Sequence, residues 1–170
     1  MRNWFWNRRQ FSLFYRDAAH VTAVEPNPLI HARGAERLRK ASVPIDVVEA
    51  IAEVLPFEDN AFDTVIATLV FCTIPDPPTA LAEIQRVSKP NAEILFFEHV
   101  RMEQPVLGKT QDLLNPLWNK ICDGCHLNRD TMSIIQQSRL DVVEVKQLYN
   151  KLFLSIRCKN NKRTIERSVF

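Results

Sequence analysis

One stretch, Glu53–His99, constrains the fold of this chain more than any other. Two short apolar runs within it, Thr64–Leu69 and Ile94–Phe97, are typical of strands buried on both faces of a sheet. Between these runs, Asp76 can cap a helix that has prolines in its first turn and apolar residues at helical spacing. A strand, a crossover helix and a second strand predict a right-handed parallel unit. Ligands bind beyond the carboxyl ends of such strands, so we expect a site near residues 68–73 and 98–101.

Strand and helix patterns alternate through the rest of the chain. Further strands are predicted at His20–Glu25, Ile45–Val48, Asp141–Leu148 and Leu152–Cys158. Helices are predicted at Leu29–Lys40, at Ile51–Leu55, at Gln111–Cys122 with an interruption near Pro116, and at Arg129–Arg139 with Asn128 as its cap, while residues 101–110 are expected to form a loop. The short link between the last two strands requires an antiparallel pair. The predicted fold class is α/β, with a Rossmann-like doubly wound sheet that is mostly parallel and has an antiparallel last strand.

Composition limits the classes of protein to which the chain can belong. Its 170 residues are 46% hydrophobic and 25% charged with a formal net charge of +2, which suits one soluble domain with a real core. No basic stripe with interleaved aromatic residues suggests nucleic acid, and no apolar run approaches the ~20 residues that span a bilayer. Four cysteines without an export signal favour reduced thiols and a cytoplasmic location. For the basic, aromatic N-terminus, contact with a membrane surface is an alternative to packing or fraying.

Four sequence blocks, taken in their order and spacing, resemble a known family. They are VTAVEPNP, AEVLPFEDNAFDTVIATLVFCTIPDP, EIQRVSKPNAEILFFEHVR and LLNPLWNKICDGCHLNRDT. Together they resemble class I S-adenosylmethionine-dependent methyltransferases of the type 11 group, and the last block resembles the thiol methyltransferase subgroup. The resemblance implies a seven-stranded sheet with an antiparallel last strand. It also implies S-adenosyl-L-methionine as the cofactor and a small, apolar or thiol-bearing molecule as the methyl acceptor.

The resemblance further implies which residues bind the cofactor. Glu25 stands where the family places an acid on the two ribose hydroxyls, and a carboxylate can accept both hydrogen bonds. The alternative for Glu25 is a solvated acid at the end of a strand. The other implied cofactor residues lie beside Glu25, flank the adenine or line the methionine pocket; they are Pro26, Asn27, Ile51, Ala52, Glu53, Thr68 and Leu69. For Leu69, plain packing in the core is the alternative.

The glycine-rich loop of the family is absent from its expected positions. Counting back from Glu25 places the glycines of GxGxG near residues 5, 7 and 9, where this chain has Phe5, Asn7 and Arg9. Glycines let such a loop approach a cofactor in backbone conformations that are closed to other residues. We therefore expect an atypical or shortened segment at residues 1–20 with the first strand largely missing, a methyltransferase-like domain at 21–158 and a polar tail at 159–170. A non-catalytic remnant or binding subunit with the same fold is the second functional hypothesis.

Several titratable side chains stand near the expected site. The candidate catalytic residues are Glu98, His99 and His126, with Asp130 as a further candidate base. Methyl transfer needs a base only if the acceptor is protonated. A thiol acceptor would need little help, because thiolate is partly present near neutral pH. For Glu98 and His99, a capped and hydrogen-bonded strand end is the alternative to catalysis.

A C-x-x-C-H run is formed by Cys122, Cys125 and His126, and taken alone it is a signature for attachment of c-type haem. The family block contains GCHL and accounts for Cys125 and His126 without haem. A zinc site formed by Cys72, Cys122, Cys125 and a histidine is the other alternative, and it requires these residues to converge in space. From the sequence we therefore expect neither haem nor a bound metal, and we expect Cys125 and His126 to line an acceptor pocket or pack beneath it.

Overall fold

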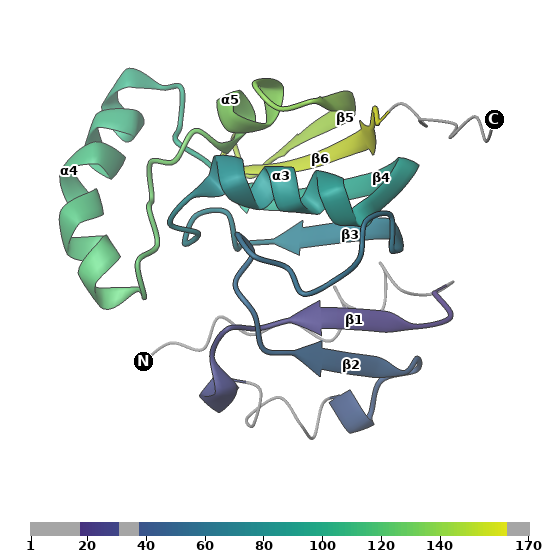
Figure 1. Ribbon diagram of the computed structural model, residues 1–170. Helices are drawn as coiled ribbons and strands as arrows, with labels where there is room; N and C mark the ends of the chain where they lie inside the picture. Colours follow the sequence, from purple (N-terminus) through teal and green to yellow (C-terminus); the bar gives the residue numbers. More distant parts are fainter. Residues whose placement is uncertain (1–17, 31–37, 163–170) are drawn as a thin grey trace. The chain divides into compact units, whose positions relative to one another are not determined.

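The computed structural model describes residues 18–30 and 38–162, and the chain divides into two units, residues 1–51 and 52–170 (Figure 1). In the first unit, strands β1 (Val21–Val24) and β2 (Ile45–Val48) pair in parallel. The pairing is in register along the full length of both strands. These two strands were predicted from their apolar, β-branched composition, and the prediction is confirmed.

Two predictions for the N-terminal part of the chain fall on residues that the structure does not describe. The helix predicted at Leu29–Lys40 includes residues 31–37, which lie outside the described residues. The substituted positions of the glycine-rich loop, Phe5, Asn7 and Arg9, also lie outside them. Both predictions therefore stay predictions.

The second unit contains a four-stranded sheet with the order β3-β4-β6-β5 (Figure 1). Its strands are β3 (Phe62–Thr68), β4 (Ser88–His99), β5 (Leu140–Leu148) and β6 (Phe153–Asn160). Strands β3 and β4 are parallel, whereas β6 runs antiparallel to both of its neighbours, β4 and β5. The predicted antiparallel last strand is thus confirmed. Within the described part of the chain, β3 pairs only with β4 and so forms one edge of this sheet.

Helix α3 (Pro77–Val87) connects β3 to β4 and completes the predicted strand–helix–strand unit (Figure 1). Asp76 caps the helix, because its carboxylate accepts hydrogen bonds from the backbone N of Thr79 at 3.3 Å and from the Thr79 hydroxyl at 2.6 Å. The helical spacing buries one face against the sheet, consisting of Pro77, Ala80, Leu81, Ile84 and Val87. The core also contains Phe71, Ile94, Phe96 and Ile156.

Helix α4 (Pro105–Ile121) is longer than predicted, since it begins at Pro105 rather than Gln111 and continues through Pro116. Pro105 suits the first turn, where a backbone N–H has no partner within the helix. Gly108 lies in the segment predicted as a loop, but in the helix it allows close packing: a Cβ at this position would lie 2.6 Å from the carbonyl oxygen of Met102. The prediction of a loop is therefore wrong from residue 105 onward.

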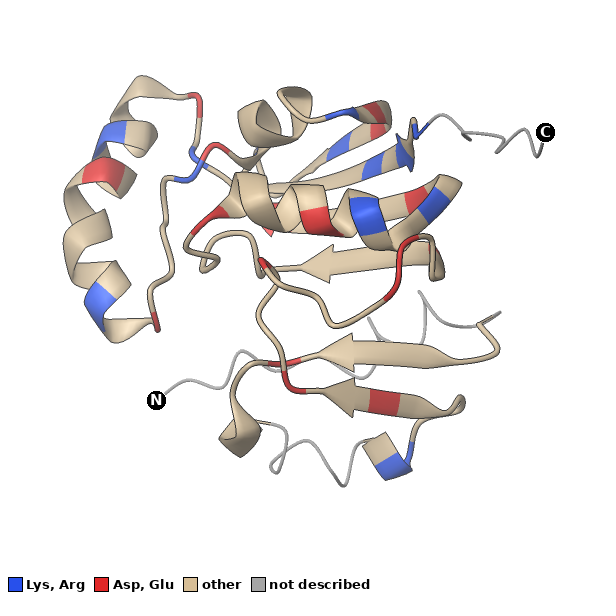
Figure 2. Ribbon diagram, viewed as in Figure 1, with Lys and Arg blue, Asp and Glu red and all other residues tan. Residues whose placement is uncertain are grey.

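Helix α4 is followed by a loop that contributes to the candidate site. Figure 2 shows only scattered charges along it, and its exposed large apolar side chains are Val106, Leu107, Leu113, Leu114, Leu117 and Ile121. Gln111 Nε2 donates to the carbonyl of Val100 at 3.2 Å and to that of Leu127 at 3.0 Å. These bonds fix the chain after β4 beside the loop that follows α4.

Among the described residues, no helix is long and apolar enough to cross a membrane.

Helix α5 (Thr131–Gln136) is shorter than predicted and begins two residues later. Asp130, not the residue expected from the sequence, is its cap and accepts a hydrogen bond from the backbone N of Ser133 at 3.0 Å. The hydroxyl of Ser138 donates to the carbonyl of Ile135 at 2.6 Å, which turns the chain toward β5. The helix therefore ends before the predicted boundary because a side chain supplies the next hydrogen bond.

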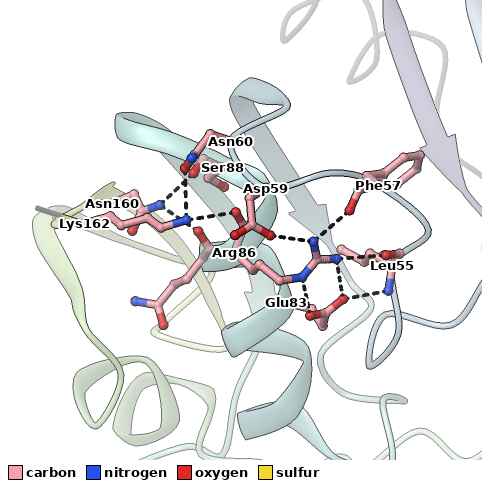
Figure 3. A network of polar contacts seen from close by, with 10 residues as sticks. Leu55, Phe57, Asp59, Asn60, Glu83, Arg86, Ser88, Asn160 and Lys162 are labelled. Carbon is pink, nitrogen blue, oxygen red and sulfur yellow. Dashed lines mark hydrogen bonds and ion pairs between the residues drawn. The ribbon is translucent and has the colours of Figure 1, made fainter. Parts of the chain in front are cut away.

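No helix forms at residues 51–55, although the sequence predicts one. Tertiary hydrogen bonds hold this segment instead (Figure 3). The backbone N of Leu55 donates to Glu83 Oε2 at 2.9 Å, and Arg86 Nη2 donates to the carbonyl of Leu55 at 2.9 Å. Arg86 Nη1 also donates to the carbonyl of Phe57 at 2.7 Å. Side chains of α3 thus satisfy the backbone groups that a short helix would otherwise have used.

Candidate functional site

The carboxyl ends of β3 and β4 are neighbours, as the strand–helix–strand pattern predicts. The ladder between them runs to Thr68, which is opposite Phe97, and the backbone N of Leu69 then donates to the carbonyl of Phe97 at 2.8 Å. Leu69 has a positive φ of 53°, a conformation that residues other than glycine seldom adopt. The chain therefore leaves β3 sharply and forms a turn, residues 70–74, beside the end of β4.

Glu98 holds this turn in place from within the core. Its side chain is fully buried, and Oε1 accepts hydrogen bonds from the backbone N of Val70 at 2.9 Å and of Phe71 at 3.2 Å. Burial raises the pKa of Glu98 to about 7, although the two backbone N–H groups oppose the shift. Its second oxygen, Oε2, is buried without a hydrogen-bond partner among the described residues.

Two thiols and an imidazole meet at the strand ends and form what we call the sulfur–imidazole cluster, consisting of Cys72, His99 and Cys125. Their Sγ and ring nitrogen atoms all lie within 4.8 Å of one another. His99 Nε2 lies 3.3 Å from Cys125 Sγ. All three residues are buried, with exposed fractions of 3% for Cys72, 7% for His99 and 5% for Cys125. Cys72 comes from the turn after β3, His99 from the end of β4 and Cys125 from the loop after α4.

The electrostatics of the cluster shift the pKa values of its two thiols in opposite directions, downward for Cys125 and upward for Cys72. The hydrogen bond from the Cys72 thiol is the largest of the effects that lower the pKa of Cys125 to about 4, and His99 and Trp118 act in the same direction against burial. That hydrogen bond, burial and the charge of Glu98 together raise the pKa of Cys72. Trp118 Nε1 is buried and has no partner in hydrogen-bond geometry within the described part of the chain.

Arg129 supplies a positive charge to the same region. Its Nη1 donates to the carbonyl of Phe71 at 2.7 Å and to the carbonyl of Ile74 at 2.5 Å. Burial lowers the pKa of Arg129, while electrostatic interactions with Cys72, Cys125 and Glu98 oppose that shift. A guanidinium nevertheless stays charged in proteins. The turn that carries Cys72 is thus held by a carboxylate on its N–H groups and by a guanidinium on its carbonyls.

His126 lies outside the cluster, although the sequence places it next to Cys125. Asn115 Nδ2 lies 3.5 Å from His126 Nδ1, and Asn119 Nδ2 lies 3.3 Å from His126 Nε2, so the imidazole is held by two amides of α4. The backbone N of His126 donates to the carbonyl of Cys72 at 2.8 Å. His126 therefore ties the loop after α4 to the turn after β3. The further candidate base, Asp130, is occupied as the cap of α5.

The residues implied to bind the cofactor lie in both units. In the first unit, Glu25 Oε1 accepts a hydrogen bond from the backbone N of Asn27 at 2.9 Å, and Asn27 Oδ1 accepts one from the backbone N of Leu29 at 3.0 Å. Pro26 and Ile51 of this unit are exposed. In the second unit, Glu53 accepts a hydrogen bond from the backbone N of Asp76 at 3.2 Å. Ala52 is partly buried and packs against the core of this second unit.

The structure brings together a different set of residues from the one that the C-x-x-C-H run suggests. Cys72 and Cys125 converge as the zinc alternative requires, but the histidine beside them is His99, and Cys122 is not among the three clustered side chains. The sequence held one usable signal, because Cys72 and His99 each stand at the carboxyl end of one of two neighbouring strands. The part played by Arg129 depends on contacts with the turn after β3 that no local pattern reveals.

The parallel sheet with one reversed strand, and a site at the carboxyl ends of its strands, define an α/β domain of the class I methyltransferase type. Residues 7–96 match the methyltransferase domain family of type 11, and the chain belongs to this family. A curated relative, thiol S-methyltransferase TMT1B of Rattus norvegicus, is 32% identical over 137 residues, covering 78% of this chain and 56% of the relative. The chain thus spans about half the length of the curated relatives that it matches.

Two solved structures show the same fold. The [4+2]-cyclase SpnF aligns with a TM-score of 0.70 and 16% identity, covering 89% of this chain and 70% of that chain. A SAM-dependent methyltransferase from Methanosarcina mazei aligns with a TM-score of 0.66 and 20% identity, covering 87% of this chain and 85% of that chain. Because a cyclase and a methyltransferase both match, the likeness establishes the fold and not the reaction.

Proposed function

We propose that this domain serves S-adenosylmethionine-dependent methyl transfer to a small, thiol-bearing acceptor. Family membership and the name of the rat relative support the proposal. The observation that carries it is the sulfur–imidazole cluster at the carboxyl ends of β3 and β4, because ligands of open α/β sheets bind beyond such strand ends. S-adenosylmethionine supplies an activated methyl group when it is bound. The work of the protein is then largely to align the acceptor with that methyl.

The residues implied to hold the cofactor suit it in chemical type. Glu25 uses Oε1 for its own turn, and Oε2 makes no hydrogen bond among the described residues, so it is available to a ribose hydroxyl. Thr68 ends β3 and Leu69 follows it in a sharp turn, and both residues are half-buried at the carboxyl end of the strand, where ligands of open α/β sheets bind. Ile51 offers no side-chain hydrogen bond, so recognition of adenine near it would rest on backbone groups.

Of the three candidate catalytic residues, His99 best fits contact with the acceptor. It ends β4 and lies 3.3 Å from Cys125 Sγ, in the part of the site that is rich in sulfur. Glu98 and His126 are better assigned as positioning residues. Oε1 of Glu98 bonds the turn after β3, and both ring nitrogens of His126 face amides of α4.

A transfer assay with radiolabelled methyl donor tests the proposal. The purified chain is given a high concentration of S-adenosylmethionine and either a small alkyl thiol or the alcohol of the same carbon skeleton. We expect labelled thioether from the thiol and no labelled ether from the alcohol. The Glu25→Ala variant should lose cofactor affinity, whereas Glu49→Ala, which removes an exposed carboxylate just after β2, should not. Methylation of the alcohol in preference to the thiol would contradict the acceptor assignment.

The second candidate function, a non-catalytic domain of the same fold, is favoured by one observation. Phe5, Asn7 and Arg9 stand where the family has the glycines of its cofactor loop. Bulky side chains there would obstruct the backbone approach to the cofactor, so we predict that this chain binds S-adenosylmethionine weakly if the domain is catalytic and not at all if it is not. Isothermal titration measures this directly. Micromolar affinity would remove the support for a non-catalytic role, and absence of binding and transfer at every cofactor concentration would establish it.

A further inference from the structure

We propose that Cys72, His99 and Cys125 form a zinc site whose fourth coordination position is open to a thiol ligand. From the sequence alone no metal is expected, because the convergence of the cysteines cannot be seen there. The structure supplies that convergence with a histidine of β4 in place of the one in the C-x-x-C-H run. Two thiolates and one imidazole form a ligand set that Zn²⁺ favours, and in catalytic zinc sites three protein ligands leave one position for water or substrate.

The distances suit tetrahedral coordination. With bonds of about 2.3 Å to sulfur and about 2.0 Å to nitrogen, tetrahedral angles place two sulfur ligands about 3.8 Å apart and a sulfur and a nitrogen about 3.5 Å apart. His99 Nε2 and Cys125 Sγ are separated by 3.3 Å, and every pair of candidate ligand atoms lies within 4.8 Å. Small side-chain movements therefore suffice to bring all three atoms to bonding distance of one ion.

The charge balance also suits a buried divalent cation. Zn²⁺ with two thiolates and a neutral imidazole carries no net charge, which is the condition under which ionic groups are buried at low cost. Two further charged groups lie nearby, the carboxyl group of Glu98 and the guanidinium of Arg129. When Glu98 is ionised, their charges cancel and the surroundings add no net charge to the site. With exposed fractions of 3–7%, the ligands are withdrawn from bulk water.

The three ligands are held by contacts that do not depend on a metal. Cys72 lies in a turn that is fixed by Glu98 and Arg129. The loop that contains Cys125 is fixed by the bond from the backbone N of His126 to the carbonyl of Cys72 and by the bond from Asn119 Nδ2 to the carbonyl of Gly124 at 2.8 Å. The site is thus preformed, so that little ordering entropy opposes metal binding.

The open position deepens the proposed function and rests on it. A small thiol that binds there displaces water, loses its proton to the solvent and becomes a thiolate bound to zinc. Zinc-bound thiols are deprotonated outright, so no protein base is required. This assigns His99 as a ligand rather than as a proton acceptor.

Metal content tests the site independently of catalysis. The untagged full chain, produced with zinc in the medium and dialysed against metal-free buffer, should retain one zinc per chain by elemental analysis. The variants Cys72→Ser and Cys125→Ser should retain almost none. Cys158→Ser is the matched control, because it removes a buried thiol elsewhere, on β6. Cys122→Ser tests the alternative that the first cysteine of the C-x-x-C-H run is a ligand. Both variants should retain zinc. A metal-free wild-type chain, or equal zinc in all variants, would overturn the proposal.

Cobalt substitution covers the case in which the serine variants fail to fold. Co²⁺ added to the reduced, metal-free wild-type chain should give a thiolate-to-cobalt charge-transfer band and the intense visible bands of tetrahedral cobalt. Titration with 2-mercaptoethanol should shift these bands if the fourth position takes a thiol. An octahedral cobalt spectrum would overturn the site. So would a chain that forms a Cys72–Cys125 disulfide in air and, once the disulfide is reduced, still binds no metal. Tetrahedral bands that do not respond to the thiol would overturn only the open position, whatever the outcome of the methyl transfer assay.

Discussion

Asn160 joins the last strand to the end of helix α3 through one side-chain amide. It is 2% exposed, and its Nδ2 donates to the carbonyls of Gln85 at 2.9 Å, Ser88 at 3.1 Å and Lys89 at 3.4 Å. Figure 3 shows Asn160 beside Ser88. Asn160→Ala would remove this donor from all three carbonyls, which we expect to lower the free energy of unfolding by about 1–3 kcal/mol. Urea denaturation measures this. Asn161→Ala, at the exposed neighbouring position, should change stability little, and equal effects of the two substitutions would contradict the prediction.

The ion pair between Glu83 and Arg86 makes stability depend on pH. A hydrogen bond from Arg86 is the main reason that the pKa of Glu83 is lowered, and the backbone N of Leu55 adds to it. The Glu83 carboxylate is therefore protonated at a higher pH in the unfolded chain than in the folded protein. The stabilisation of the folded protein by this ion pair is present above the ordinary glutamate pKa of about 4.3 and is lost as the pH falls through the lower pKa of the folded state.

The test of this pH dependence compares Glu83→Gln with the wild type. The substitution should destabilise the protein at neutral pH, and the difference should shrink as the pH falls below the ordinary glutamate pKa. Unfolding free energies from urea titrations at several pH values give the two curves. Glu58→Gln, at an exposed carboxylate without an ion pair in the described part of the chain, should leave the curve unchanged. Parallel curves for the wild type and Glu83→Gln would show that the pair does not couple to folding.

At the scale of elements, Gly108 determines how closely helix α4 approaches the chain before it. A glycine-to-alanine change inside a helix ordinarily adds about 0.5–1 kcal/mol of stability. Here the new Cβ would lie 2.6 Å from the carbonyl oxygen of Met102, which is backbone and cannot move freely. We therefore expect Gly108→Ala to lower the thermal midpoint and to weaken hydrogen-exchange protection in α4. Lys109→Ala, at an exposed position of the same helix, is the control, and a raised midpoint for Gly108→Ala would refute the packing argument.

Sequence patterns were reliable where an element is specified by its own residues. The strand–helix–strand unit was predictable because Asp76, the prolines after it and the helical spacing all act locally. The predicted helix at residues 51–55 was wrong because Glu83 and Arg86 of α3 bind the backbone of Leu55. Likewise, His99 could be predicted from its place at a strand end, whereas its contact with Cys125 depends on the path of the chain through α4.

At the scale of the whole molecule, the edge of β3 and the substituted glycines of the family loop together bear on the stability of the chain. Within the described residues, β3 has a strand partner on one side only, and Val65 at its centre is half-buried. Unpaired backbone groups cost about 1–3 kcal/mol each when they are buried, and a domain has only about 5–15 kcal/mol of stability. An open strand edge also favours association with other chains. We therefore expect the chain to be marginally stable or to associate at raised concentration.

Replacing residues 1–17 with a family-like segment, consisting of a strand followed by GxGxG, should correct stability and cofactor binding together. The added strand would pair with the edge of β3 that has no strand partner among the described residues and would raise the thermal midpoint, and the glycines would let the backbone approach S-adenosylmethionine. Cofactor binding created in this way should depend on Glu25, so Glu25→Ala in the chimera should abolish it while Glu49→Ala should not. Calorimetry and isothermal titration on the original chain, the chimera and its two variants provide the measurements. If the chimera gains stability but its cofactor affinity does not change on Glu25→Ala, the assignment of Glu25 to the ribose is wrong; if it gains neither, the equivalence of the N-terminal segment to the family loop fails.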